Sequence, residues 1–210
     1  MGSPEAGGQQ LPAPTSRSTA AFAAATRRSL VMPPGLRKLA LAAHLTISVG
    51  WIGAVIGYLA LDVTVATSGD PSVVRAAWIA MGRIAGWAIV PLAFASLLTG
   101  LVMALGTKWG LFRRWWVLIS FLLTLGATGV LLSEARVIGE SAAMAADPTT
   151  STDQLLAVPS TLPHSVGGLA VLLAVQVLNI YKPQGLTPYG WRKLQEERRR
   201  DELRRAGVRL

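Results

Sequence analysis

The stretch from Leu39 to Leu61, LALAAHLTISVGWIGAVIGYLAL, decides the fold of this chain. His44 is the one ionisable side chain in its interior, and as a helix the stretch is long enough to cross a hydrocarbon core of about 30 Å. A segment in lipid must satisfy its own backbone hydrogen bonds, and these apolar residues do not alternate as those of a barrel strand do. The stretch therefore predicts a transmembrane α-helix.

Three more apolar stretches follow, at Ile84 to Leu105, Trp115 to Leu132 and Ser165 to Tyr181. Hydrophobic residues make up 51% of the 210 residues and charged residues 15%, against roughly a quarter charged in a typical soluble domain. A soluble core of this size cannot hide four stretches of membrane length. We therefore expect an all-α fold, a four-helix transmembrane bundle over residues 36–182 whose outer face contacts the lipid bilayer.

Basic residues fall on one side of the predicted bundle. Residues 1–38, 106–114 and 182–210 hold 17 of the 20 Lys and Arg residues, whereas the other two loops hold three, together with six acidic residues. An excess of Lys and Arg marks the cytoplasmic side, so both termini are predicted to be cytoplasmic. The basic excess behind the net charge of +9 then lies at the cytoplasmic membrane surface, where it meets anionic lipid, and we expect no nucleic-acid partner.

The segments outside the spans have their own signals. Residues 1–35 are rich in Ala, Ser, Pro, Gly and Gln and predict a disordered cytoplasmic tail, and residues 183–210 predict a basic cytoplasmic C-terminal helix. Asp70-Pro71 is typical of a helix start, so the second helix is expected to begin there. The third is expected to continue through Ala146 and to end at Asp147-Pro148.

The motif inventory argues against several enzyme classes. The chain has no cysteine, which excludes disulfides, iron–sulfur clusters, zinc–thiolate sites and cysteine nucleophiles. The sequence also has no phosphate-binding glycine loop, no G-x-S-x-G and no H-E-x-x-H motif. We therefore favour a non-enzymatic role in interaction, assembly or small-ligand binding, with a second copy or another membrane protein as candidate partner.

One face of the first helix carries most of its polar side chains. Steps of three and four residues align His44, Ser48, Trp51, Val55, Tyr58 and Asp62. Such a stripe either packs against other helices, or it supplies a ligand or proton carrier through its intramembrane histidine. The candidate cofactor-binding residues are His44, Ser48, Trp51, Tyr58 and Ser120, with His44 also the candidate metal ligand.

His44 makes haem b the candidate cofactor. His164 lies at the opposite end of the bundle, roughly 25 Å away by helical rise, so the two histidines cannot clamp one iron. Without a cofactor, we predict that His44 is neutral at pH 7 and bonded to a polar group on a neighbouring helix. Ser120 lies at the same depth and is the predicted partner, directly or through water.

Three further sets of residues carry predictions. Interhelical hydrogen bonds are expected from Ser96, Thr99, Ser120, Thr124, Gln176 and Asn179. Close helix packing is expected at the two G-x-x-x-G pairs, Gly53 with Gly57 and Gly82 with Gly86. An outer ion-pair cluster, or alternatively a small-solute site, is expected from Asp62, Arg83, Glu134 and Arg136. A membrane-interface anchor is expected from Lys108, Trp109, Arg113, Arg114, Trp115 and Trp116.

The sequence also resembles a known group of small bacterial membrane proteins. His44, Trp51 and Gly53 match the H-x(6)-W-x-G opening helix of the copper-resistance protein D group, the haem-binding membrane protoporphyrinogen oxidase and an uncharacterised predicted integral membrane family. The segments Trp109–Val117 and Tyr181–Trp191 look like actinobacterial members of the last of these, and the likeness covers residues 36–192.

The resemblance implies a four-helix protein of a bacterial plasma membrane. In the haem-binding relative the first-helix histidine, matched by His44, is an iron ligand, and a lysine on the third helix is functional. Ser120 stands where that lysine would be, which weakens the case for oxidase chemistry. A haem- or metal-binding redox protein built on His44 is the alternative function, and a minimal transporter is a third.

Overall fold

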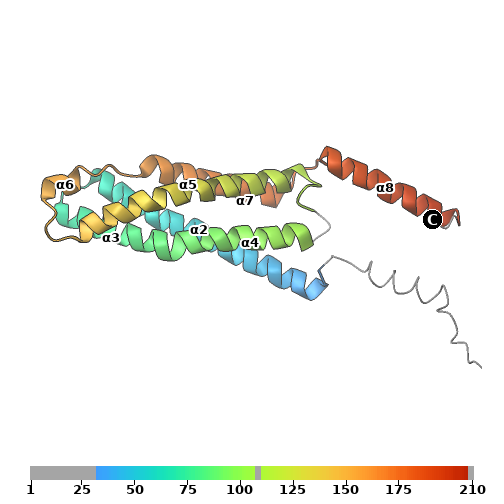
Figure 1. Ribbon diagram of the computed structural model, residues 1–210, viewed down its shortest axis with the longest axis horizontal. Helices are drawn as coiled ribbons and strands as arrows, with labels where there is room; N and C mark the ends of the chain where they lie inside the picture. The colour runs from blue at the N-terminus through green and yellow to red at the C-terminus, as the bar shows by residue number, and fades with distance from the viewer. Residues whose placement is uncertain (1–31, 107–109, 208–210) are drawn as a thin grey trace, which may run out of the picture.

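The computed structural model describes residues 32–106 and 110–207. Within those two ranges the chain forms helices and no strand. The elements are α2 (Pro34–Thr67), α3 (Pro71–Ile84), η1 (Ala85–Ile89), α4 (Val90–Gly106), α5 (Trp115–Ala146), α6 (Thr152–Leu156), α7 (Leu162–Tyr181) and α8 (Pro188–Arg205). Figure 1 shows the long helices side by side along one axis, with α6 at one end and α8 beyond the other.

Four helices are long and apolar enough to cross a membrane, which confirms the predicted all-α four-helix bundle. They are α2, the continuous α3–η1–α4 helix, α5 and α7. Only between 6% and 22% of the most apolar window of each is buried, so most apolar side chains face outward. Such a surface is stable in lipid and not in water, and the chain is therefore a multi-pass membrane protein.

The two ends of the bundle need names. We call the end that holds α6 and the α2–α3 turn the loop end (Figure 1). The opposite end, where the described chain enters at Met32 and leaves toward α8, is the terminal end. Residues 1–31 of the predicted tail, and Lys108 and Trp109 of the predicted anchor, lie outside the described residues.

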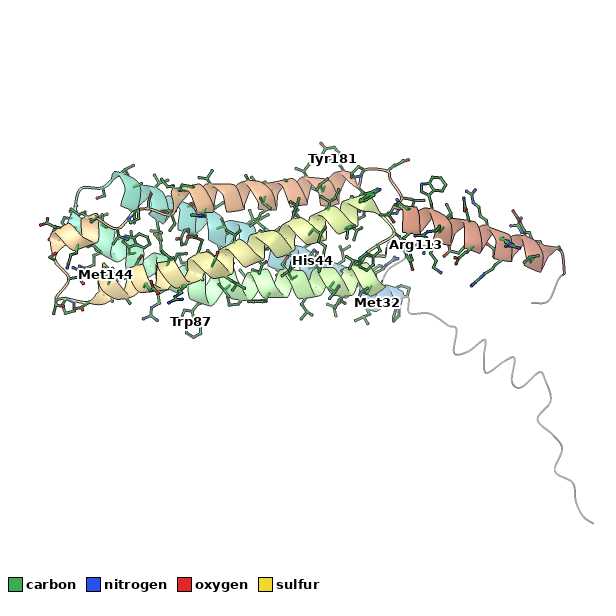
Figure 2. All side chains as sticks on the ribbon, turned by 45° about the horizontal axis from the view of Figure 1, so that its top comes forward. Met32, His44, Trp87, Arg113, Met144 and Tyr181 are labelled. Atoms are coloured by element: carbon green, nitrogen blue, oxygen red, sulfur yellow. The ribbon has the colours of Figure 1, made fainter. Side chains whose placement is uncertain are left out.

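A proline explains the irregular turn in the second span. Pro91 has no backbone N–H and its ring crowds the carbonyl one turn earlier, so the regular ladder cannot pass through it. The turn before it is a π-helix, in which Val90 N–H bonds to the carbonyl of Ala85, five residues back. Trp87 lies on this turn, is 80% exposed and points away from the bundle (Figure 2).

Helix caps hold the loop end together. The Asp70 side chain accepts the backbone N–H of Ser72 at 2.8 Å, and α3 begins at Pro71 as predicted. The Arg75 guanidinium donates to the carbonyls of Ala145, Asp147 and Thr150, which satisfies the open end of α5. Helix α5 ends at Ala146, also as predicted.

The same end contains the best-packed apolar core. Trp78 and Met81 of α3 and Leu155 of α6 are fully buried, together with Ala145 of α5. These residues lie at or beyond the ends of the predicted spans. The loop end therefore has a compact apolar core, of the kind found in water-soluble proteins, next to the membrane-spanning part of the bundle.

At the terminal end, α8 is attached through the α4–α5 connection. Thr187 donates its hydroxyl to the carbonyl of Phe112, and Arg113 pairs with Glu197 at 2.8 Å. A Cβ at Gly190 would collide with the carbonyl oxygen of Arg113, so glycine is required at this close approach. The charged segment is helical, as predicted, and Figure 1 shows it continuing away from the bundle.

Candidate functional site

His44 is held by a helix other than the predicted one. Its Nδ1 lies 2.9 Å from the hydroxyl of Thr99 on α4, and that hydroxyl donates its hydrogen to the carbonyl of Ala95 at 2.7 Å. A hydroxyl has one hydrogen, so Thr99 must accept the bond from His44. The network therefore assigns the hydrogen to Nδ1, and in the neutral ring Nε2 carries a lone pair.

The prediction of a polar partner on a neighbouring helix is confirmed, but the predicted residue, Ser120, does not bond to His44. Equal depth fixed the height of Ser120 correctly, and both residues line one cavity. Depth does not decide which helix meets the histidine face of α2. That neighbour is α4, as the 3.1 Å bond between Ser48 and Ser96 also shows.

The cavity beside His44 lies between α2, α4, α5 and α7 and measures about 710 Å³. We call it the terminal-end cavity. Its polar lining comes from all four helices: His44, Ser48, Ser96, Ser120, Thr124, Gln176 and Asn179. Three cations complete the lining, Arg37 and Lys38 at the start of α2 and Lys182 after α7, and no acidic residue is among the lining residues. The cavity is therefore positively charged at its mouth.

Two buried polar groups in this lining have no hydrogen-bond partner within residues 32–106 and 110–207. They are the hydroxyl of Ser120, whose residue is 6% exposed, and the indole N–H of Trp51, whose residue is 3% exposed. Leaving a buried donor unpaired costs about 1–3 kcal/mol. Structures retain few such groups, and each one requires an explanation such as a ligand or water that bonds to it.

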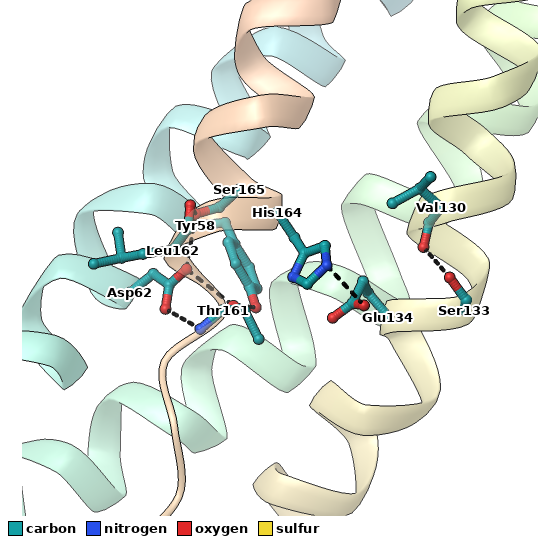
Figure 3. A network of polar contacts seen from close by, with 9 residues as sticks. All are labelled: Tyr58, Asp62, Val130, Ser133, Glu134, Thr161, Leu162, His164 and Ser165. Atoms are coloured by element: carbon teal, nitrogen blue, oxygen red, sulfur yellow. Dashed lines mark hydrogen bonds and ion pairs between the residues drawn. The ribbon is translucent and has the colours of Figure 1, made fainter.

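The polar groups around Asp62 at the loop end are paired instead, although the indole N–H of Trp78 in the core of that end has no partner among the described residues. Asp62 is fully buried and accepts hydrogen bonds from the backbone N–H of Thr161 at 3.0 Å, the Thr161 hydroxyl at 2.9 Å and the Ser165 hydroxyl at 2.8 Å (Figure 3). The Tyr58 hydroxyl lies 2.7 Å from that of Thr161. Because Thr161 already donates to Asp62, Tyr58 is the donor in this pair.

Asp62 caps a helix to which it does not belong. Helix α7 begins at Leu162 after its N-cap residue Thr161. The carboxylate of Asp62 lies against this N-terminus, where the helix dipole favours negative charge and free N–H groups need acceptors. Tyr58 and Asp62, at one end of the predicted polar stripe, therefore join α2 to α7 by hydrogen bonds. Their polar groups are used in these bonds and are not available to a cofactor.

The predicted outer ion-pair cluster does not form as expected. Glu134 pairs with His164 at 3.4 Å (Figure 3), and Arg136 pairs with Glu140 on its own helix at 3.0 Å. Within the described ranges, no ion pair joins any two of the four predicted residues. The reason is that Asp62 turns inward to α7, where hydroxyl and backbone donors satisfy it without a cation.

A second cavity, of about 420 Å³, lies between α2, η1, α5 and α7 toward the loop end. We call it the loop-end cavity. Its lining is almost entirely apolar, with Glu134 and His164 among the few polar residues. Gly126 of α5 and Gly167 and Gly168 of α7 also line it, and a Cβ at any of them would meet no atom within 4 Å. Small residues therefore leave open space between α5 and α7.

Only one of the four predicted packing glycines makes a close contact. A Cβ at Gly82 would stand 2.5 Å from the Cβ of Ala142, so α3 and α5 approach closely there. Gly53, Gly57 and Gly86 have nothing within 4 Å of such an atom. The spacing alone could not separate these cases, because it does not show which face of a helix meets a neighbour.

The predicted anchor divides into different roles. Trp115 is 48% exposed at the helix start, whereas Trp116 is buried and lines the terminal-end cavity. Arg113 pairs with Glu197 of α8. Sequence reasoning did not assign Arg37, Lys38 and Lys182 to a site, and their positions at the terminal ends of α2 and α7 are the signal that could have found them.

Comparisons with protein-family models, with curated proteins and with solved structures found no match to this chain. The function must therefore be argued from the residues themselves.

Proposed function

We propose that this protein is a non-catalytic membrane protein that binds a small amphipathic molecule with an anionic group in the terminal-end cavity. The observation that carries the proposal is the lining of that cavity. Arg37, Lys38 and Lys182 provide three positive charges at the mouth, and hydroxyl and amide groups from four helices lie deeper. Cationic side chains bind carboxylate and phosphate groups strongly, because both partners are charged.

The unpaired donors point to a bound polar group. Ser120 and Trp51 each have a buried hydrogen that no atom in the described part of the chain accepts. A ligand whose oxygen atoms reach them would remove the cost of the unpaired donors. The surrounding helices contribute mainly hydroxyls, amides and one histidine, a set that suits recognition better than bond cleavage.

Octyl phosphate is a suitable first probe, with the protein in nanodiscs of neutral lipid. We expect the phosphate to raise the unfolding temperature, because a ligand at one hundred times its Kd stabilises the folded state by about 2.7 kcal/mol. Octanol, which has the same chain and no charge, is expected to produce no such shift. Equal shifts with both compounds, or none with either, would contradict the proposal.

The charge requirement is tested with paired variants. Replacing Lys38 and Lys182 together by Gln is expected to weaken octyl phosphate binding about tenfold or more, because charge-assisted hydrogen bonds are lost. Arg192→Gln is the matched control, since Arg192 is an exposed residue of α8 that does not line the cavity. An equal effect of the control would indicate a non-specific charge effect.

Haem b bound through His44 is the second candidate. The hydrogen bond from Nδ1 to Thr99 is the arrangement that orients an iron-ligating histidine, and it leaves Nε2 as the candidate ligand atom. The rim cations could bind the propionates, and Met103 of the same lining offers a thioether. A bound haem would supply one-electron redox chemistry. An absorption spectrum of the purified protein tests this: a Soret band that His44→Ala removes and His164→Ala retains would favour haem over the first proposal.

We also propose that the terminal end is cytoplasmic, in a bacterial plasma membrane. The gathering of basic residues at that end supports the orientation, and the bacterial membrane is what the sequence resemblance implies. The chain contains no cysteine, so single cysteines report topology directly. In intact cells, an impermeant maleimide is expected to label Thr152→Cys and not Gln195→Cys. The reverse pattern would overturn the orientation.

A further inference from the structure

The two cavities share a wall inside the bundle. Trp51 of α2 and Leu172 of α7 line both of them, and every other lining residue belongs to one cavity only. Along α2 the combined lining runs from Arg37 to Tyr58, which is roughly 30 Å at the rise of an α-helix. This length equals the hydrocarbon thickness of a bilayer. The cavities therefore follow one another along α2 over a length comparable to the hydrocarbon thickness of a bilayer.

The two parts differ in chemistry in the way that the two parts of a lipid differ. The terminal-end cavity has three cations at its mouth and a polar lining, whereas the loop-end cavity is almost entirely apolar. Trp51, which lines both cavities and is 3% exposed, marks the junction between them.

The space between α5 and α7 is suited to an alkyl chain. Gly126, Gly167 and Gly168 remove the side chains that would fill it. The remaining lining includes Val130, Val171 and Leu131, which offer dispersion contacts and no hydrogen bonds. An empty apolar space of this size costs stability, so an apolar occupant would stabilise the bundle.

We propose that the two cavities hold one ligand, a single-chain lipid with an anionic head. The head lies among Arg37, Lys38 and Lys182, and the chain passes Trp51 and Leu172 into the loop-end cavity. This inference rests on the proposed function, because it takes the same cavity as the head site. It adds the class of ligand and a second half to the site.

Photolabelling locates the chain directly. The probe is a palmitoyl lysophosphatidate with a diazirine at the chain end, bound to the full-length protein in nanodiscs of neutral lipid. We expect peptide mapping to place the label on loop-end cavity residues such as Leu131 and Val171. A label confined to outward-facing residues such as Leu125 and Leu173, or to the terminal-end cavity, would overturn the inference.

A pair of glycine variants provides the control. Gly126→Leu puts a side chain into the loop-end cavity, and Gly129→Leu adds the same side chain on the same helix outside both cavities. The first is expected to abolish chain-end labelling of Val171 while octyl phosphate still binds, and the second to change neither. Unchanged labelling in Gly126→Leu would contradict the chain position. Failure of octyl phosphate to bind the unaltered protein would instead contradict the proposed function.

Discussion

At the loop end, Asp62 is fully buried and accepts three hydrogen bonds, whereas at the terminal end Ser120 is 6% exposed and its hydroxyl bonds to no described atom. Both residues belong to membrane-spanning helices that place polar groups against protein. In the first case the fold itself supplies the partners, through the N-terminus of α7. In the second case the fold leaves a cavity. The difference teaches that polar side chains in one bundle can serve stability at one end and binding at the other.

The largest effect is expected at Asp62. Asp62→Ala leaves the Thr161 N–H and the hydroxyls of Thr161 and Ser165 without their acceptor, and should lower the free energy of unfolding by about 3 kcal/mol or more. Reversible unfolding in mixed micelles measures it. Asp62→Asn keeps one acceptor oxygen and should lose less, and exposed Asp153→Ala should lose almost nothing. A loss as small as that of Asp153→Ala would remove the distinction between the two ends.

The close approach of α3 and α5 comes next. Gly82→Ala forces its new Cβ against Ala142, and overpacking of this kind destabilises by about 1–3 kcal/mol. Gly57→Ala adds the same atom where nothing lies within 4 Å, and should change stability by less than about 1 kcal/mol. Thermal unfolding of the two variants compares them. Equal losses would show that the loop end is not packed more tightly than the outer face of α2.

At the terminal end, two substitutions compare a side chain that has a hydrogen-bond partner with one that has none among the described residues. Thr99→Val removes the acceptor of His44 and should cost about 1 kcal/mol. Ser120→Ala removes a hydroxyl without a partner and should leave stability unchanged within about 0.5 kcal/mol, while lowering octyl phosphate affinity. The same unfolding assay, followed by ligand titration, checks both. A clear loss of stability in Ser120→Ala would mean that the hydroxyl is part of the fold.

The smallest effect concerns acid stability at the loop end. Hydrogen bonds from the Ser72 hydroxyl and N–H lower the pKa of Asp70, which is fully exposed at the start of α3. In the unfolded chain the carboxyl has its ordinary pKa of about 3.9, so its contribution is present above that pH and is lost as the pH falls through the lower folded pKa. Asp70→Asn should therefore make the free energy of unfolding depend less on pH below about pH 4. An unchanged pH dependence in that range would show that this cap contributes nothing measurable.

Much of the fold is determined by the sequence alone. Long apolar stretches in a chain of low charge predict the four spans, because in lipid each backbone must satisfy its own hydrogen bonds locally. Asp70-Pro71 and Asp147-Pro148 set helix ends by local chemistry, and both ends lie where they were predicted. The polar stripe from His44 to Asp62 was also visible, because helical spacing alone fixes which side chains share a face.

What the tertiary structure decided is which helix meets which face. Depth along the membrane made Ser120 the expected partner of His44, but the rotation of α4 about its axis brings Thr99 there instead. The packing of α7 against α2 likewise places Asp62 at the start of α7, and the packing of all four helices leaves two cavities that share Trp51 as a wall. The physical reason is that spacing along one helix sets height and face, whereas the neighbour is chosen by the sum of weak contacts over all four helices. No single segment of the sequence contains that sum.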